Sequence, residues 1–152
     1  MQTLANPTDK ASLLDRLSRL EAATPRKWGR MSAHQVVCHL SDSYRVAMGE
    51  RDAKAVDTFI SRTLMRFIAI NTPLPWPQGV PTLREVDQEQ GGTSPLEFAK
   101  DMQQLRALIE RFAAMPRDFS FAPHPAFGRL SEREWLHWGW RHPDHHLRQF
   151  GL

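Results

Sequence analysis

A regular seam of apolar residues between positions 98 and 112 constrains the fold of this chain more than any other sequence feature. Phe98, Met102, Leu105, Ile109 and Phe112 follow one another at spacings of four, three, four and three residues. This spacing places all five side chains on one narrow face of an α-helix, as in the seam of a helical bundle. Such a helix has to bury its seam against other helices, so the sequence favours an all-α fold.

Helix-start signals precede other apolar stripes in the chain. Ser32 followed by Gln35, and Ser131 followed by Glu134, form capping boxes, in which each side chain caps the other residue's backbone N–H. The stretch Ser94-Pro95-Leu96-Glu97 has the pattern of a third capping box, with proline at the first helical position. We therefore expect four principal helices, near residues 9–22, 32–48, 94–114 and 131–149.

Two further segments complete the predicted architecture. Residues 54–70 are apolar at helical spacing and predict an additional helix. Residues 71–93 contain several prolines and end in Gly91-Gly92, so they predict a crossover or a functional loop. No segment has a convincing strand pattern. The sequence thus predicts a single domain over residues 1–152, a four-helix bundle with a long crossover and an additional helix.

Charge and composition argue against several functional classes. The net charge is only +3 and the basic residues are interleaved with acids. The sequence therefore lacks the clustered basic patch that is typical of nucleic-acid-binding proteins. The longest apolar stretches are too short to span a membrane, and the first ten residues lack a signal-peptide pattern. The one cysteine, Cys38, allows no internal disulfide. We expect a cytoplasmic protein with a small-molecule substrate and no nucleic-acid or membrane partner.

The end of the chain carries the strongest chemical signal. His142 and His146 stand four residues apart, so on a helix their imidazoles lie on one face. His39 lies on the stripe of the predicted second helix that should face the core. Facing helices of a bundle bring such side chains together. Three neutral imidazoles with an open position form a catalytic type of zinc or nickel site.

The same histidines have a simpler interpretation as surface residues. His142 and His146 lie near a helix C-terminus, where the helix dipole favours basic side chains, and pairs at this spacing also occur by chance. Pro143 removes the backbone hydrogen bond to the carbonyl of Gly139, so the helix either continues with a kink or breaks at His142. A break would separate the pair, and at this point both alternatives stay open.

Other polar residues are candidates for the chemistry around such an ion. Asp42, one turn after His39, is a candidate acceptor for the second nitrogen of that ring. Asp42, His145 and Glu134 are candidates for proton transfer. His145 points about a quarter turn away from the histidine pair and is expected to line a pocket or to support the ligands, with a plain surface residue as the alternative. Cys38 points to a different helix face from His39, has no base placed beside it, and is expected to be a buried, inert thiol.

The remaining histidines have no ligand pattern. His34 and His137 are expected to be structural. His124 lies before the last helix, whose expected start at Ser131 is about 16 Å along the axis from His142, so we expect a pocket or structural residue and no ligand. The loop of residues 71–93 and the segment 124–128 are expected to border the site.

Taken together, these motifs resemble a known superfamily. His39-Leu40-x-Asp42-Ser43, with His142-x-x-His145-His146-x-Arg148-Gln149, resembles the DinB-like (YfiT-like) superfamily of metalloenzymes. The segment from His124 to Trp135 is similar to a poorly characterised branch of it. The resemblance covers residues 25–50 and 122–152 well, and the middle only by length and Pro-Trp-Pro character. Pro143 departs from the family pattern.

The resemblance implies a helical bundle that is often dimeric and that holds nickel or zinc on His39, His142 and His146. Characterised relatives include transferases and isomerases that depend on a low-molecular-weight thiol. The resemblance therefore implies a metal-dependent transferase or hydrolase acting on a small molecule, with such a thiol as a possible second cofactor. A non-catalytic metal- or small-molecule-binding module is the alternative. Phe59, Phe67 and Trp76, outside the predicted seams, favour a homodimer.

Overall fold

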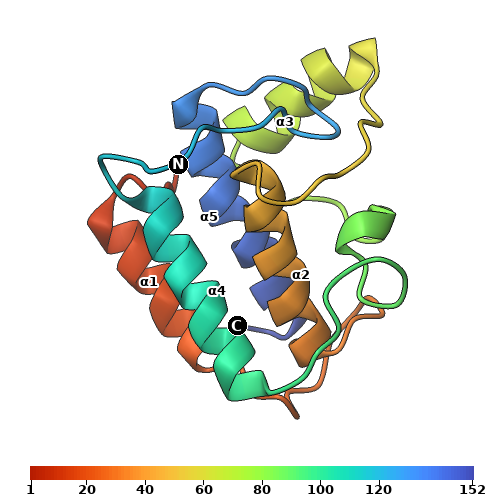
Figure 1. Ribbon diagram of the computed structural model, residues 1–152, viewed down its shortest axis with the longest axis vertical. Coiled ribbons are helices and arrows are strands. Elements are labelled where there is room, and N and C mark those ends of the chain that lie inside the picture. The colour runs from red at the N-terminus through yellow and green to blue at the C-terminus, as the bar shows by residue number, and fades with distance from the viewer.

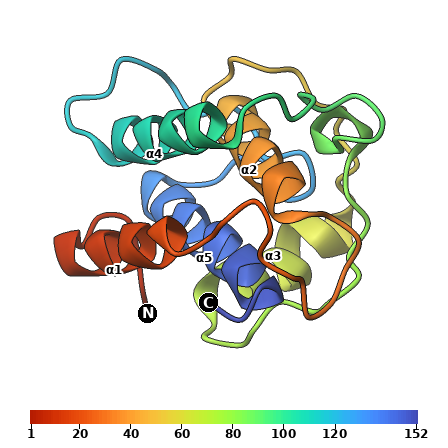
Figure 2. The ribbon, with the colours of Figure 1, turned by 90° about the horizontal axis from the view of Figure 1, so that it is seen from below.

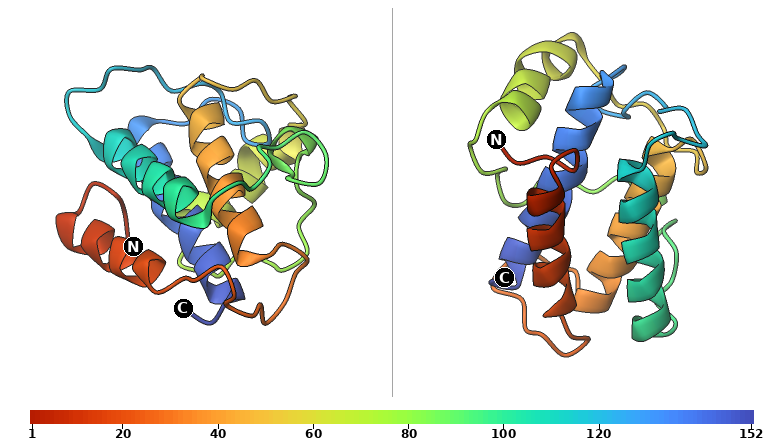
Figure 3. Two further views of the ribbon diagram at one scale, coloured as in Figure 1. Left: turned by 60° about the horizontal axis from the view of Figure 1, so that its bottom comes forward. Right: turned by 90° about the vertical axis from the view of Figure 1, so that its left-hand side faces the viewer.

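Four long helices build the protein, and they share one hydrophobic core. The computed structural model describes residues 1–152 and contains no strand. The long helices are α1 (Pro7–Ser18), α2 (Ala33–Ala47), α4 (Phe98–Ala113) and α5 (Glu132–Gln149). α2 packs against α4, and α1 packs against α5, so the helices labelled in Figure 1 form two adjacent pairs, which the right-hand view of Figure 3 shows. The prediction of an all-α fold is confirmed.

The seam predicted for α4 forms part of this core. Leu105, Ile109 and Phe112 are completely covered, while Phe98 and Met102 are partly buried against the core. The residues expected to be buried on α1 and α2 are also in the core, namely Leu17, Val36 and Leu40. The burial of these apolar stripes supplies most of the free energy that favours packing of the helices.

The predicted starts of α2 and α5 are confirmed. Ser32 caps α2 in a complete capping box with Gln35, and Ser131 caps α5 in the same way with Glu134. The predicted span of the first helix is displaced by several residues. α1 begins at Pro7 because the side chain of Asn6 accepts hydrogen bonds from the first-turn backbone, and it ends at Ser18.

The predicted start of α4 at Ser94 is wrong. The helix begins at Phe98, and Glu97 before it has an extended backbone with no side-chain cap. The backbone N–H of Leu96 donates instead to the carboxylate of Asp101 at 3.2 Å, which holds the chain outside the helix. A local Ser-Pro-x-Glu pattern was therefore overridden by a contact with the first turn of α4.

The additional helix differs from its prediction in both length and environment. Residues 59–60 lead into a π-helical segment η1 (Ser61–Met65), followed by the short α3 (Arg66–Asn71), which packs on α5. Most of its apolar side chains point to solvent: Phe59 is 81% exposed and Phe67 is 59% exposed, whereas Ile70 is buried. Seen from below, α5 lies between α1 and α3 (Figure 2). None of the helices combines the length and the apolar character that a membrane span requires.

The crossover from α3 to α4 is anchored to α2 by a buried carboxylate. It contains one short 3-10 turn, η2 (Arg84–Val86). Asp42 on α2 accepts hydrogen bonds from the backbone N–H and the hydroxyl of Thr93, both at 2.7 Å, and from the amide of Gln88 at 3.2 Å. This anchoring places η2 beside the middle of α2, where His39 lies.

Candidate metal centre

α5 continues through Pro143, so the break that would have separated the two histidines does not occur. Pro143 has no N–H to donate to the carbonyl of Gly139. The hydroxyl of Tyr44 on α2 donates to that carbonyl instead, at 2.5 Å. Because the helix is continuous, His142 and His146 remain on one face and point toward α2.

The structure brings His39, His142 and His146 together. The Nε2 atoms of His39 and His142 lie 3.2 Å apart, and one ring nitrogen from each histidine lies within 4.8 Å of the others. Two nitrogens bound tetrahedrally at 2.0–2.1 Å from zinc would lie about 3.3 Å apart. The spacing of His39 and His142 therefore fits a shared divalent ion with little movement. His39 is buried and the other two are partly exposed, which leaves an approach from solvent.

In two of the three rings, a hydrogen bond from Nδ1 determines the tautomer and leaves Nε2 without a proton. His39 Nδ1 donates to the carbonyl of Val86 in η2 at 2.8 Å, so its Nε2 carries the lone pair. His146 Nδ1 donates to the side-chain oxygen of Gln149 at 3.2 Å. Gln149 is oriented in turn by its own N–H₂, which donates to the carbonyl of Trp28 at 2.9 Å. Nε2 of both rings is therefore left without a proton and can bind a metal ion. Histidine ligands at metal sites are commonly oriented by such a hydrogen bond from the other ring nitrogen.

Burial keeps these imidazoles neutral. Loss of solvation lowers the pKa of His39, and it lowers the pKa of His142 and His146 well below the ordinary value. The mutual proximity of the three rings lowers the pKa of His142 and His146 further, because two imidazolium charges would repel each other. Neutral imidazole is the form that binds a metal.

Asp42 and Glu134 do not occupy the places expected for them. The partner of His39 is the carbonyl of Val86, while Asp42 is fully buried among Thr93, Gln88 and two arginines. Asp42 was expected to accept from His39. The Val86 carbonyl takes that place because the crossover lies closer to His39 Nδ1 than the next turn of α2 does.

Glu134 has two structural roles at the start of α5. It completes the capping box with Ser131 and forms a bidentate ion pair with Arg66, at 2.8 and 2.6 Å. Burial raises the pKa of Glu134, but the hydrogen bonds from Arg66 and Ser131 outweigh it and bring the pKa to about 2. Glu134 precedes His142 by eight residues, about 12 Å along the helix. It therefore lies outside the three-histidine cluster.

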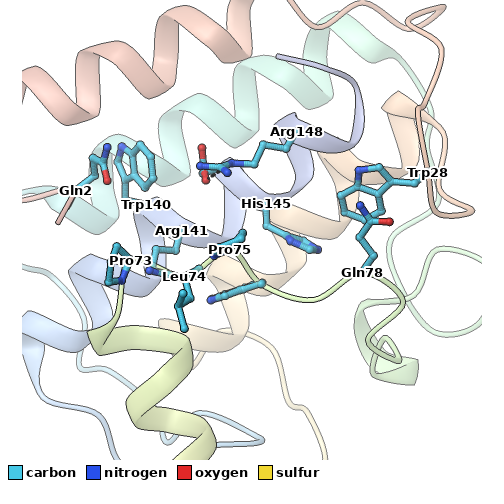
Figure 4. Close-up of a pocket in the computed structure, with 12 residues that line it drawn as sticks. Gln2, Trp28, Pro73, Leu74, Pro75, Gln78, Trp140, Arg141, His145 and Arg148 are labelled. Carbon is cyan, nitrogen blue, oxygen red and sulfur yellow. Dashed lines mark hydrogen bonds and ion pairs between the residues drawn. The ribbon is translucent and has the colours of Figure 1, made fainter.

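His145 lines a pocket of about 230 Å³ next to the cluster, as expected (Figure 4). Its ring lies 5.0 Å from that of Trp28 and 5.7 Å from that of Trp76. Trp76, in the crossover, also lies 5.7 Å from the ring of His142 and so connects the pocket to the cluster. Burial lowers the pKa of His145, which keeps it neutral.

The pocket carries an excess of positive charge. Arg141 and Arg148 line it together with one acid, Asp144. Asp144 is already paired with Arg148 at 2.8 Å and with Arg16 at 2.7 Å. The guanidinium of Arg141 donates to the carbonyls of Thr72 and Leu74, so it holds the start of the crossover. Arg148 pairs with Asp144 through Nε alone, and its exposed terminal NH₂ groups can still face an anionic group on a ligand.

The other histidines have structural partners. His124 Nδ1 accepts from the backbone N–H of Ala126 and Phe127, at 3.1 and 3.2 Å, which rules it out as a ligand through that nitrogen. Burial lowers the pKa of His124 to about 3. His137 Nδ1 donates to the carbonyl of Gln2 at 3.0 Å.

Cys38 has neighbours that the sequence did not indicate. The carboxylate of Asp101 lies 3.7 Å from its sulfur and 2.7 Å from Nε2 of His34. The expectation that no base stands beside the thiol is therefore wrong. The thiol nevertheless stays protonated, because burial and the charge of Asp101 raise the pKa of Cys38 to about 12.

Sequence reasoning missed the groups that orient the imidazoles of the three-histidine cluster. Gln149 stands three residues after His146, and this helical spacing was a usable signal. The carbonyls of Val86 and Trp28 left no signal, because any residue type supplies a carbonyl. Gly29 also contributes, since a Cβ there would lie 2.3 Å from the Gln149 side-chain nitrogen.

Comparison with known proteins gives one match. A family model described as "Protein of unknown function (DUF1569)" matches residues 6–151, which is nearly the whole chain. No curated protein and no solved structure matches the chain. The geometry described above is therefore the basis for any functional assignment.

Proposed function

The chain belongs to the DUF1569 family of proteins of unknown function, and from that premise we propose that it is a metal-dependent enzyme acting on a small molecule. The observation that carries the proposal is the convergence of three neutral imidazoles from α2 and α5, two of them with fixed tautomers. The proposed ligands of one nickel or zinc ion are His39, His142 and His146. Imidazole nitrogen suits both metals, and three protein ligands leave an open position.

The proposal includes membership of the DinB-like superfamily, as a poorly characterised branch. Its support is the placement of one histidine on the second long helix and two, four apart, on the last, with a long crossover before α4. On this proposal the four long helices form the bundle of that superfamily. The reaction class is then a transferase or hydrolase, and a low-molecular-weight thiol is the proposed second cofactor.

The ion and one residue beside the cluster have separate proposed roles in the reaction. A bound divalent ion would act as a Lewis acid that lowers the pKa of a thiol or water. His145 is the proposed proton-transfer residue, because it is neutral and lies between the cluster and the pocket. Asp42 and Glu134 are not proposed for this role, since arginines and backbone groups already occupy their carboxylates.

The pocket beside His145 is the proposed substrate site. Its volume of about 230 Å³ suits a compact molecule, below the usual size of a drug-like ligand. Trp28 (Figure 4) and Trp76 line it with flat apolar surfaces. Arg148 lies on its rim, more than half exposed, and adds positive charge. These features favour a small substrate or thiol that carries an anionic group and a planar or apolar part.

A screen of low-molecular-weight thiols and water against electrophilic small molecules tests the proposal. Wild-type protein loaded with nickel or zinc should show turnover that disappears in His146→Ala. His145→Ala should keep the ion and lose about 10²- to 10⁴-fold in rate, the usual contribution of a proton-transfer residue. Turnover that persists in His146→Ala would overturn the metal-dependent assignment. Ligand binding with no turnover in any combination would identify the alternative, a non-catalytic binding module.

A further inference from the structure

A second group of metal-ligating side chains lies between α2 and α4. His34 and Cys38 stand four residues apart on α2 and share a helix face, and Asp101 lies in the first turn of α4. The Asp101 carboxylate lies 2.7 Å from His34 Nε2 and 3.7 Å from Cys38 Sγ. One nitrogen, one sulfur and one oxygen lie within 4.8 Å of one another. None of these residues takes part in the three-histidine cluster.

The burial of this group is graded from the core to solvent. Cys38 is 2% exposed, whereas the side chains of His34 and Asp101 are 20% and 19% exposed. The sulfur is therefore enclosed by protein, while the nitrogen and oxygen border solvent. This arrangement offers three protein ligands, a route by which an ion enters, and room for water as a fourth ligand.

We propose that His34, Cys38 and Asp101 form a second site for a divalent ion of the zinc class. Binding of the ion would displace the proton of the Cys38 thiol to solvent. The resulting thiolate and the Asp101 carboxylate together neutralise the charge of the ion, so the complex carries no net charge into a largely buried place. The three imidazoles of the first site would instead leave a charge of +2. A sulfur ligand also selects softer ions than a set of nitrogens does.

The two distances to the Asp101 carboxylate lie near those of a tetrahedral site. Tetrahedral zinc with bonds of about 2.3 Å to sulfur and 2.0–2.2 Å to oxygen and nitrogen separates sulfur from oxygen by about 3.6 Å, and nitrogen from oxygen by about 3.3 Å. The Cys38–Asp101 distance of 3.7 Å is close to this value. The His34–Asp101 pair has to open by about 0.6 Å, since it is now joined by a hydrogen bond. Such a site would tie α2 to α4.

Cobalt(II) is the appropriate probe, because coordination by a thiolate produces a sulfur-to-cobalt charge-transfer band in the near ultraviolet. Cys38 is the one cysteine of the chain, so this band reports on the second site alone. Titration of the metal-free protein should produce the band in the wild type and in His146→Ala. It should be absent in Cys38→Ser. His34→Ala and Asp101→Asn should weaken cobalt affinity at this site by about tenfold or more.

Two results would overturn the proposal. One is the absence of the band at saturating cobalt in folded wild-type protein, which would leave only a hydrogen-bonded network. The other is a band whose affinity is unchanged in both His34→Ala and Asp101→Asn, which would indicate adventitious binding to the thiol. Circular dichroism of each variant identifies those that remain folded. Because His146→Ala retains Cys38, failure of the first site leaves this test intact.

Discussion

The hydroxyl of Tyr44 donates to the carbonyl of Gly139 at 2.5 Å, across the interface between α2 and α5. In an uninterrupted helix that carbonyl would accept from the N–H of residue 143, which is a proline here. Tyr44 is 1% exposed, so the bond replaces a missing backbone interaction inside the core. It also links the helix that carries His39 to the helix that carries the other two histidines.

Tyr44→Phe should lower the free energy of unfolding by about 1–3 kcal/mol, because it leaves a buried carbonyl without a partner. The cost should be smaller in the background of Pro143→Ala, where the N–H of residue 143 is free to donate to Gly139. Denaturant unfolding of the four proteins in this double-mutant cycle measures the coupling. Strictly additive effects would show that the tyrosine does not compensate for the proline.

Stability should fall as the pH is lowered from neutral, in part because of His124. Its pKa is lowered to about 3 by burial, whereas an unfolded histidine titrates near 6.5. Between these values the unfolded chain binds a proton that the folded protein does not. The contribution of His124 to the free energy of unfolding is therefore fully present above about pH 6.5. As the pH falls from there toward about 3, it declines by up to about 1.4 kcal/mol per pH unit.

His124→Asn isolates this contribution. The asparagine oxygen replaces Nδ1 as the acceptor for the N–H groups of Ala126 and Phe127 but does not titrate. The slope of unfolding free energy against pH, measured between about pH 4 and 6, should decrease by about one proton in the variant. An identical slope in both proteins would contradict the assignment, as would a slope of opposite sign.

Gln149→Ala should weaken metal binding at the three-histidine cluster about 10- to 100-fold, the usual effect of removing a group that orients a ligand. The variant removes the acceptor that fixes the tautomer of His146. Isothermal titration with nickel or zinc in the Cys38→Ser background measures this site alone. Gln103→Ala, an exposed glutamine on α4, is the matched control and should bind like the parent. Equal affinity in both variants would show that Gln149 plays no orienting role.

The protein should be a homodimer joined through the exposed apolar side chains of residues 56–80. Phe59, Ile60, Leu64 and Phe67 are each more than half exposed on the segment that contains η1 and α3. An apolar surface of this kind usually marks an interface. Light scattering should give twice the mass of the chain for the wild type and the mass of one chain for Phe59→Ser/Phe67→Ser. A wild type that is monomeric at high concentration would contradict this prediction.

Helix positions followed from the sequence wherever local pattern and core packing agreed. The α4 seam and the capping boxes at Ser32 and Ser131 are examples. Prediction failed where a side-chain contact outside the local pattern decided the conformation. Asp101 holds Leu96 outside α4, so a valid capping pattern at Ser94 was not used. The apolar period of residues 54–70 indicated helix but did not show that its side chains would face solvent.

In the candidate site too, features set by local spacing were predictable and features set by tertiary contacts were not. The spacing of His142 and His146 and the position of His39 on its stripe were sufficient to bring the rings together in the prediction. The partners of the rings were not predictable in the same way. Asp42 was the nearest acid in sequence, but the crossover brought the Val86 carbonyl to His39 and left Asp42 to hold Thr93. The hydrogen-bond partner of His39 therefore depends on tertiary packing, which a local sequence pattern does not reveal.

The most direct test of the central claim is the number of divalent ions per chain, measured by elemental analysis of purified, untagged protein after nickel or zinc loading. His146→Ala should contain one ion fewer than the wild type, because it removes a ligand of the proposed site and leaves the helices in place. His145→Ala should match the wild type, since His145 lines the pocket and is not a proposed ligand. A folded His146→Ala protein with the full wild-type metal content would contradict the assignment of His39, His142 and His146 as the metal site.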